Sequence, residues 1–72
     1  MRLNKSQALL FIYETLMKNR RITKSEVQDV LDIPDLTFRR YMQEIRAYLY
    51  NFYKTEELKY SKKGGYYYLT EE

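Results

Sequence analysis

Apolar residues repeat every three or four positions in the first quarter of the chain. They occupy Leu9, Leu10, Ile12, Tyr13, Leu16 and Met17. This period is typical of an amphipathic helix with one face on a core. We therefore predict a first helix over about residues 4–18. The basic stretch that follows leads into Ile22, an apolar residue between polar ones, where we expect one short strand.

A second helix is predicted over about residues 24–31. Thr23 followed by Glu26 fits the capping box, in which the hydroxyl accepts from an amide and the carboxylate reaches back to the cap. Pro34 disfavours helical geometry at Ile33, so the helix should end near Asp32. Its apolar face is expected to hold Val27, Val30 and Leu31.

The third helix should be the longest, over about residues 35–53. Pro34 and Asp35 supply start signals, a fixed φ and a first-turn carboxylate. At about 100° per residue, one side carries Phe38, Met42, Ile45, Leu49 and Phe52. The other side carries Leu36, Arg39, Arg40, Gln43 and Ala47. One face is therefore expected to be core and the other to face outward.

After Thr55 the period changes to that of strands. β-prone residues flank the segment 62–65, Lys-Lys-Gly-Gly, which predicts a hairpin over about residues 57–69. Alternation should place Tyr66 and Tyr68 on one face, packed on the third helix, with Tyr67 outward. The whole chain, 1–72, is then one domain of the α+β class, mainly α.

Composition excludes several kinds of chemistry. The chain has no cysteine and no histidine, which removes disulfides, thiolate zinc sites and thiol or imidazole catalysis. The carboxylates are scattered and no phosphate-cradling glycine loop is present, so we expect no enzyme, cofactor, metal or small-molecule ligand. The longest apolar run, residues 8–13, is too short to cross a bilayer, and a cytoplasmic location is expected.

Charge is unevenly distributed along the chain, although its net value is only +3. Residues 1–25 hold six basic side chains against one acidic, residues 26–35 hold four acidic and none basic, and residues 36–54 hold four basic against one acidic. Such segregation is compatible with a surface that faces a polyanion and also with an ordinary solvated exterior. Charge alone leaves both interpretations open.

Two helices joined by a tight turn, the second with a basic outer face, form the helix-turn-helix arrangement. An α-helix fits the major groove of DNA, where arginine can pair with guanine and glutamine with adenine. Arg39 and Gln43 are therefore the leading candidates for base contacts. Arg40 and Arg46 lie nearer the edges of this face, where phosphate is the expected partner.

Phosphate contacts are also expected at two other places. Thr23, Lys24 and Ser25 open the second helix, where free amides and the helix dipole favour an anion. Lys62 and Lys63 form a second cationic projection at the hairpin tip. Asp35 would repel DNA unless it points away.

These residues resemble a known family. The segment from Arg21 to Leu69 is similar to the winged helix-turn-helix DNA-binding domain of DeoR-type and WYL-domain bacterial transcriptional regulators. The likeness is carried by segments 22–23 (Ile-Thr), 31–33 (Leu-Asp-Ile), 37–40 (Thr-Phe-Arg-Arg) and 63–67 (Lys-Gly-Gly-Tyr-Tyr). It implies that the hairpin is the wing, that Thr37 is a further base contact, and that the chain binds double-stranded DNA sequence-specifically to regulate transcription.

Two alternatives remain open at this stage. Winged helices also serve as protein-interaction modules without DNA binding, and fold does not settle function. Aromatic residues near the end of the third helix exceed what a small core can cover, namely Tyr48, Tyr50, Phe52 and Tyr53. They indicate either a homodimer or a neighbouring C-terminal effector domain, which regulators of the resembled kind usually carry.

Overall fold

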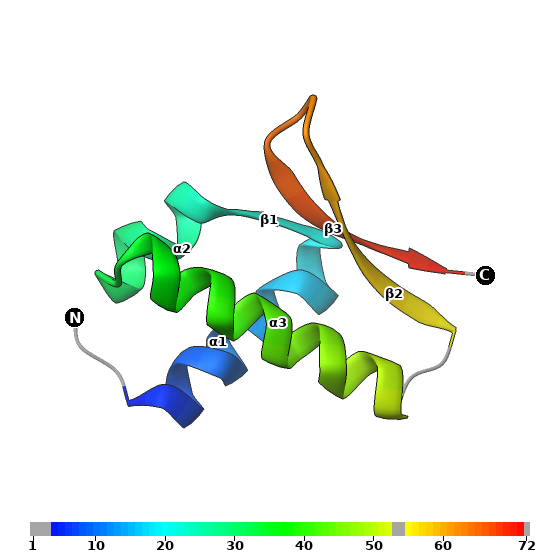
Figure 1. Ribbon diagram of the computed structural model, residues 1–72, viewed down its shortest axis with the longest axis horizontal. Coiled ribbons are helices and arrows are strands. Elements are labelled where there is room, and N and C mark those ends of the chain that lie inside the picture. Colours follow the sequence, from blue (N-terminus) through cyan, green and yellow to red (C-terminus); the bar gives the residue numbers. More distant parts are fainter. Residues whose placement is uncertain (1–3, 53–54, 72) are drawn as a thin grey trace.

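Three helices and a three-stranded antiparallel sheet make up the protein (Figure 1). The computed structural model describes residues 4–52 and 55–71. The elements are α1 (Lys5–Asn19), β1 (Arg21–Thr23), α2 (Lys24–Leu31), α3 (Asp35–Phe52), β2 (Glu56–Ser61) and β3 (Tyr66–Glu71). The predicted α+β, winged-helix class is confirmed. Tyr53, where the third helix was predicted to end, lies outside the described residues.

β3 is the central strand and joins the two ends of the domain. It pairs with β1 through Ile22 opposite Tyr67, and with β2 through Leu58 opposite Leu69. Because β1 runs directly into α2, this pairing fixes the first turn of α2 beside the hairpin. The hairpin of β2 and β3 then projects beyond the helices as a wing (Figure 1).

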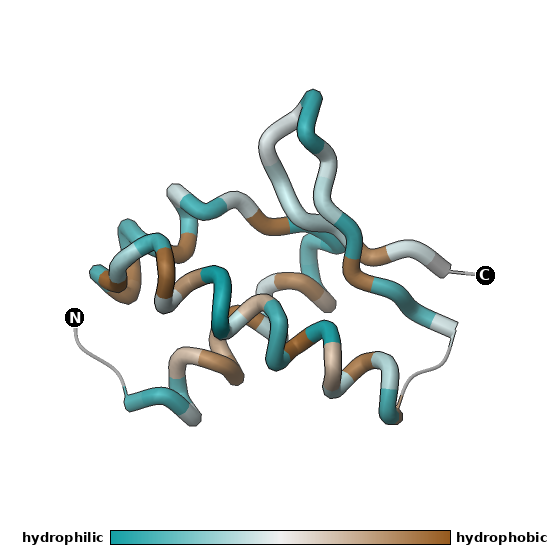
Figure 2. Tube along the Cα trace, in the orientation of Figure 1, coloured by the Kyte–Doolittle hydropathy of each residue, from teal (hydrophilic) through white to brown (hydrophobic). Residues whose placement is uncertain are grey.

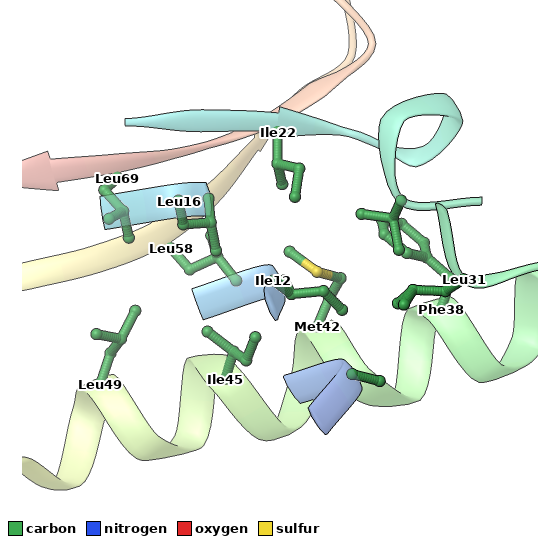
Figure 3. Close-up of a cluster of buried hydrophobic side chains, with 12 residues drawn as sticks. Ile12, Leu16, Ile22, Leu31, Phe38, Met42, Ile45, Leu49, Leu58 and Leu69 are labelled. Atoms are coloured by element: carbon green, nitrogen blue, oxygen red, sulfur yellow. The ribbon is translucent and has the colours of Figure 1, made fainter. Parts of the chain in front are cut away.

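The core lies between α1, α3 and the inner face of the sheet. Figure 3 shows Ile12 and Leu16 of α1 reaching toward the side chains that α3 presents, with Ile22 of β1 pointing in from the sheet. Twelve apolar residues are at most 8% exposed, and among the residues that the structure describes no polar side chain is fully buried. The buried set is Ala8, Ile12, Leu16, Ile22, Val27, Leu31, Phe38, Met42, Ile45, Leu49, Leu58 and Leu69.

Three residues predicted for this core lie outside it. Leu10 is 66% exposed because it lies on the side of α1 that turns away from the buried Ala8, Ile12 and Leu16. Val30 is 38% exposed because it sits at the edge of the α2 face that buries Val27 and Leu31. Phe52 is 70% exposed because it lies in the last turn of α3, beyond the part of the helix that the sheet covers.

The residues that end the first two helices have a left-handed backbone conformation, although neither is glycine. Arg20 (φ 67°) follows α1 and Asp32 (φ 52°) follows α2. Each backbone N–H donates four residues back, at 2.7 Å to the Leu16 carbonyl and 3.0 Å to the Gln28 carbonyl. These two reversals direct the chain into β1 and into α3, as helix C-caps of this geometry do.

The three consecutive tyrosines face opposite to prediction. Tyr67 packs against the core, with its ring 5.7 Å from that of Phe38. Tyr66 and Tyr68 lie on the outer face, 5.9 Å apart, and Arg21 stands over the Tyr66 ring. The cause is Leu69, whose burial fixes the alternation and so turns Tyr67, two residues earlier, inward.

No helix within residues 4–52 and 55–71 is long and apolar enough to span a membrane. The same residues hold no group of acidic side chains that could bind a metal ion.

Candidate functional site

The outward face of α3 carries three long polar side chains. Arg39, Arg40 and Gln43 are exposed, and none of them makes a hydrogen bond or ion pair with the described part of the chain. Arg39 and Gln43 are four residues apart and therefore share one side of the helix. Their donors are available to an external partner.

A groove of about 320 Å³ brings together three segments that are distant in sequence. Its walls come from the first turn of α2, the first half of α3 and the hairpin. The lining residues are Thr23, Lys24, Ser25, Phe38, Arg39, Tyr60, Gly65 and Tyr67. Arg39, the start of α2 and the hairpin therefore border one concave surface.

Three aromatic rings in contact connect the hairpin to α3. The Tyr67 ring lies 5.7 Å from Phe38 on one side and 4.8 Å from Tyr60 on the other. Sequence reasoning missed these groove residues. The signal was present, because Tyr60 and Tyr67 are each two residues from a leucine, Leu58 or Leu69, and must share its face.

The Thr23 hydroxyl is fully engaged in capping α2. It accepts from the Glu26 backbone N–H at 3.1 Å and donates to the Glu26 carboxylate at 3.2 Å. The predicted first half of the capping box is thus present, whereas the carboxylate meets the hydroxyl and not the backbone N–H. The expected phosphate contact from Thr23 stays a prediction, and its hydroxyl would have to give up the bond to the Glu26 carboxylate to donate to a phosphate. Ser25 is exposed in the same turn.

Asp35, in the first turn of α3, is bonded to two side chains of α2. Its carboxylate accepts from Gln28 Nε2 at 2.8 Å and from Lys24 Nζ at 3.2 Å. These hydrogen bonds, with the Lys24 charge, hold the pKa of Asp35 below its ordinary value. Lys24 is therefore partly neutralised by a neighbour, and it offers a phosphate less attraction than its sequence position predicted.

Two further predicted contact residues, Thr37 and Arg46, lie elsewhere on α3 or make a bond within the fold. Thr37 is half-buried and, at two residues from Arg39, lies about 160° away around the helix axis. Thr37 therefore lies on another flank of α3 from Arg39, and its assignment as a base contact stays a prediction. Arg46 shares the side of Arg39, but its Nε donates to the Leu58 carbonyl at 3.2 Å, which ties α3 to β2.

The hairpin tip presents Lys62 and Lys63 to solvent at the end of the wing, where Figure 2 shows a hydrophilic cap. Two glycines shape it. Gly65 is left-handed (φ +71°), and its N–H donates to the Ser61 carbonyl at 2.8 Å. A Cβ at Gly64 would collide with the Tyr66 ring.

A larger cavity, of about 560 Å³, lies at the other end of α3 and is lined by Arg46, Tyr50, Asn51 and residues 55–58. Two charged residues at this cavity make contacts that stabilise the fold. Arg46 bonds to the Leu58 carbonyl, and half-buried Glu56 pairs with Arg20 at 2.9 Å. These contacts hold the base of the hairpin against the helices.

A scan against protein-family models, a search of curated proteins and a search of solved structures each found no match to this chain. The likeness of Arg21–Leu69 to DeoR-type and WYL-domain regulators therefore stays a prediction, and function is inferred from the residues and their geometry.

Proposed function

We propose that this protein binds double-stranded DNA in a sequence-specific manner, as a transcriptional regulator or the DNA-binding domain of one. In this proposal α3 enters the major groove and the wing contacts the flanking backbone. Its action is binding and not catalysis, and it operates in the cytoplasm. The role in transcription rests on the resemblance described above.

One observation carries the proposal. Arg39 and Gln43 stand exposed on the side of α3 that borders the groove shared with α2 and the hairpin. A guanidinium and a carboxamide on one helix face are suited to guanine and adenine edges, respectively. Cationic side chains lie on either side of them, Lys24 at the start of α2 and Lys62 with Lys63 at the tip of the wing.

The surrounding groups would position the duplex and not read it. The exposed Arg40 guanidinium, the Ser25 hydroxyl and the wing lysines are suited to phosphate oxygens. Arg46 keeps four of its five N–H donors beyond the bond to Leu58, so it can bind a phosphate while it ties α3 to β2.

A protein-interaction module is the second candidate, and Leu36 is the observation that favours it. This leucine is 59% exposed on the same outward side of α3 as Gln43. An apolar side chain there could contact the methyl group of thymine or the surface of another protein. A measurement of DNA binding distinguishes the two candidate functions.

Selection from random duplexes, followed by sequencing, tests the proposal. The purified protein is expected to enrich a recurring motif of several base pairs. Arg39→Ala is the matched comparison, because it removes the leading base contact from an exposed position that makes no bond within the fold, and it should weaken or lose the motif. Failure of the natural chain to enrich any motif would favour the interaction module.

A further inference from the structure

A second surface, on the far flank of α3 from the groove, gathers exposed apolar side chains into one patch, of a size that is often functional. Leu10 is 66% exposed, Phe52 70% and Tyr48 42%. Half-buried residues of α1 complete this surface, which we call the α1–α3 apolar face. It consists of Leu9, Leu10, Tyr13, Met17, Tyr48 and Phe52.

Its aromatic members form a continuous row across the two helices. The Tyr48 ring lies 5.7 Å from that of Tyr13 in an edge-on arrangement and 5.1 Å from that of Phe52. α1 crosses behind α3 in Figure 1. The row therefore links the exposed surfaces of α1 and α3 into one apolar strip.

Leu10 is a ridge between two shallow grooves. It lines one groove of about 280 Å³ with Leu9, Tyr13, Ile45 and Tyr48, and a second groove with Tyr13 and Met17. Helices pack when the ridges of one enter the grooves of the other. A surface with a ridge beside a groove can satisfy this condition with a copy of itself related by a twofold axis, because each Leu10 then enters the groove of the other copy.

The charges around this face suit a second copy and not a polyanion. Glu14 and Lys18 border the second groove, and Glu44, which pairs with Lys5 at 3.0 Å, borders the first. Two positive and two negative side chains leave the rim without net charge. A copy of the chain is therefore not repelled here, although the chain as a whole carries +3.

The area is sufficient for a weak dimer. Given the size of such side chains, Leu10, Tyr48 and Phe52 expose on the order of 350 Å² in each copy. Two copies would then bury about 700 Å² of apolar surface, and with the usual polar share an interface of about 1,200 Å². This value is above the approximately 1,000 Å² expected of a biological contact and at the low end of stable ones.

We infer that the protein forms a twofold homodimer through the α1–α3 apolar face, with Leu10 of each copy in the groove beside Tyr48 of the other. Tyr48 lies nine residues from Arg39, about 180° around α3, so the dimer leaves both outward faces free. If the proposed function holds, the dimer binds two half-sites. The dimer itself does not depend on DNA binding.

Sedimentation equilibrium without DNA tests the inference, over protein concentrations from about 1 to about 200 µM, a range suited to a weak interface. The natural chain is expected to shift from monomer to dimer with rising concentration. Leu10→Glu should raise the dimer dissociation constant at least about tenfold, because it places a carboxylate in an apolar groove. Circular dichroism should show an unchanged fold, since Leu10 is exposed.

Leu36→Glu is the matched control. It makes the same substitution at a leucine of similar exposure on the other side of α3, and it should leave the dissociation constant unchanged. A monomer throughout the range would overturn the inference. So would a Leu10→Glu protein that dimerises as the natural chain does, or a Leu36→Glu protein that does not.

Discussion

Arg39 and Gln43 are the side chains on which sequence recognition depends in this account. Both are exposed, and neither is used by the fold, so their substitution should change binding without changing stability. We expect Arg39→Ala or Gln43→Ala to weaken binding to the preferred site by about 1–3 kcal/mol and to relax preference at one base pair. Competition between matched and single-mismatch duplexes measures both effects. If the Arg39→Ala protein kept the affinity and base preference of the natural chain, the assignment of α3 as the recognition helix would be wrong.

The negative charge of Asp35 lies at the edge of the same surface and should repel the phosphates of DNA. The lowered pKa of Asp35 means that the pair with Lys24 is intact at neutral pH and is lost only as pH falls below the ordinary carboxyl value of 3.8. Asp35→Asn removes one negative charge and releases the Lys24 ammonium. Affinity for any duplex should rise about two- to fivefold at low salt, the range of a surface ion pair.

Asp29→Asn is the control for this prediction. It removes the same charge from an exposed position of α2 that does not line the groove, and its effect on affinity should be smaller. If the two variants gained the same affinity for duplex DNA, only net charge would matter, and the position of Asp35 beside the groove would have no effect.

Helix boundaries are the part of the structure that local signals determine best. The proline at 34 and the threonine at 23 delimit α2, which begins and ends where predicted, at Lys24 and Leu31. What local signals could not supply is the packing partner of each face. Tyr67 and Arg46 take their roles from strands that pair with residues far along the chain, so their positions depend on the assembled sheet.

The turn between α2 and α3 depends on the left-handed conformation of Asp32. Asp32→Asn keeps a residue that tolerates this conformation and removes a negative charge from the C-terminus of α2, where the helix dipole disfavours it. We expect the free energy of unfolding to rise by about 0.3–1 kcal/mol. Asp32→Val should lower it by about 1–2 kcal/mol, because a branched side chain is strained at positive φ. Urea unfolding followed by circular dichroism distinguishes the two, and equal stability would contradict the account.

The hairpin is oriented by the Tyr67 ring between Phe38 and Tyr60. Tyr67→Ala should lower the free energy of unfolding by about 2–4 kcal/mol through the cavity it leaves. In the fraction that stays folded it should also weaken DNA binding, since the wing loses its contact with α3. Tyr67→Phe keeps the ring and should preserve both properties. A folded Tyr67→Ala protein with natural affinity would show that the wing orientation is unimportant.

Across the whole molecule, surfaces of different character occupy different sides. The domain measures 35 × 27 × 21 Å, and α3 runs through it with the groove on one flank and the α1–α3 apolar face on the other. Lys24, Arg39 and the hairpin, which are separate in the sequence, come together at the groove because β3 pairs with both β1 and β2. Sequence patterning could identify these parts, but their convergence follows from the sheet order.

The salt dependence of duplex affinity tests the central claim most directly. If the outward face of α3, the start of α2 and the wing together contact three to five phosphates, log affinity should fall with log salt with a slope of about −3 to −4.5. Between about 50 and 200 mM salt this slope corresponds to a loss of about 50- to 500-fold. A slope near zero, or no duplex binding at the lowest salt, would contradict the account.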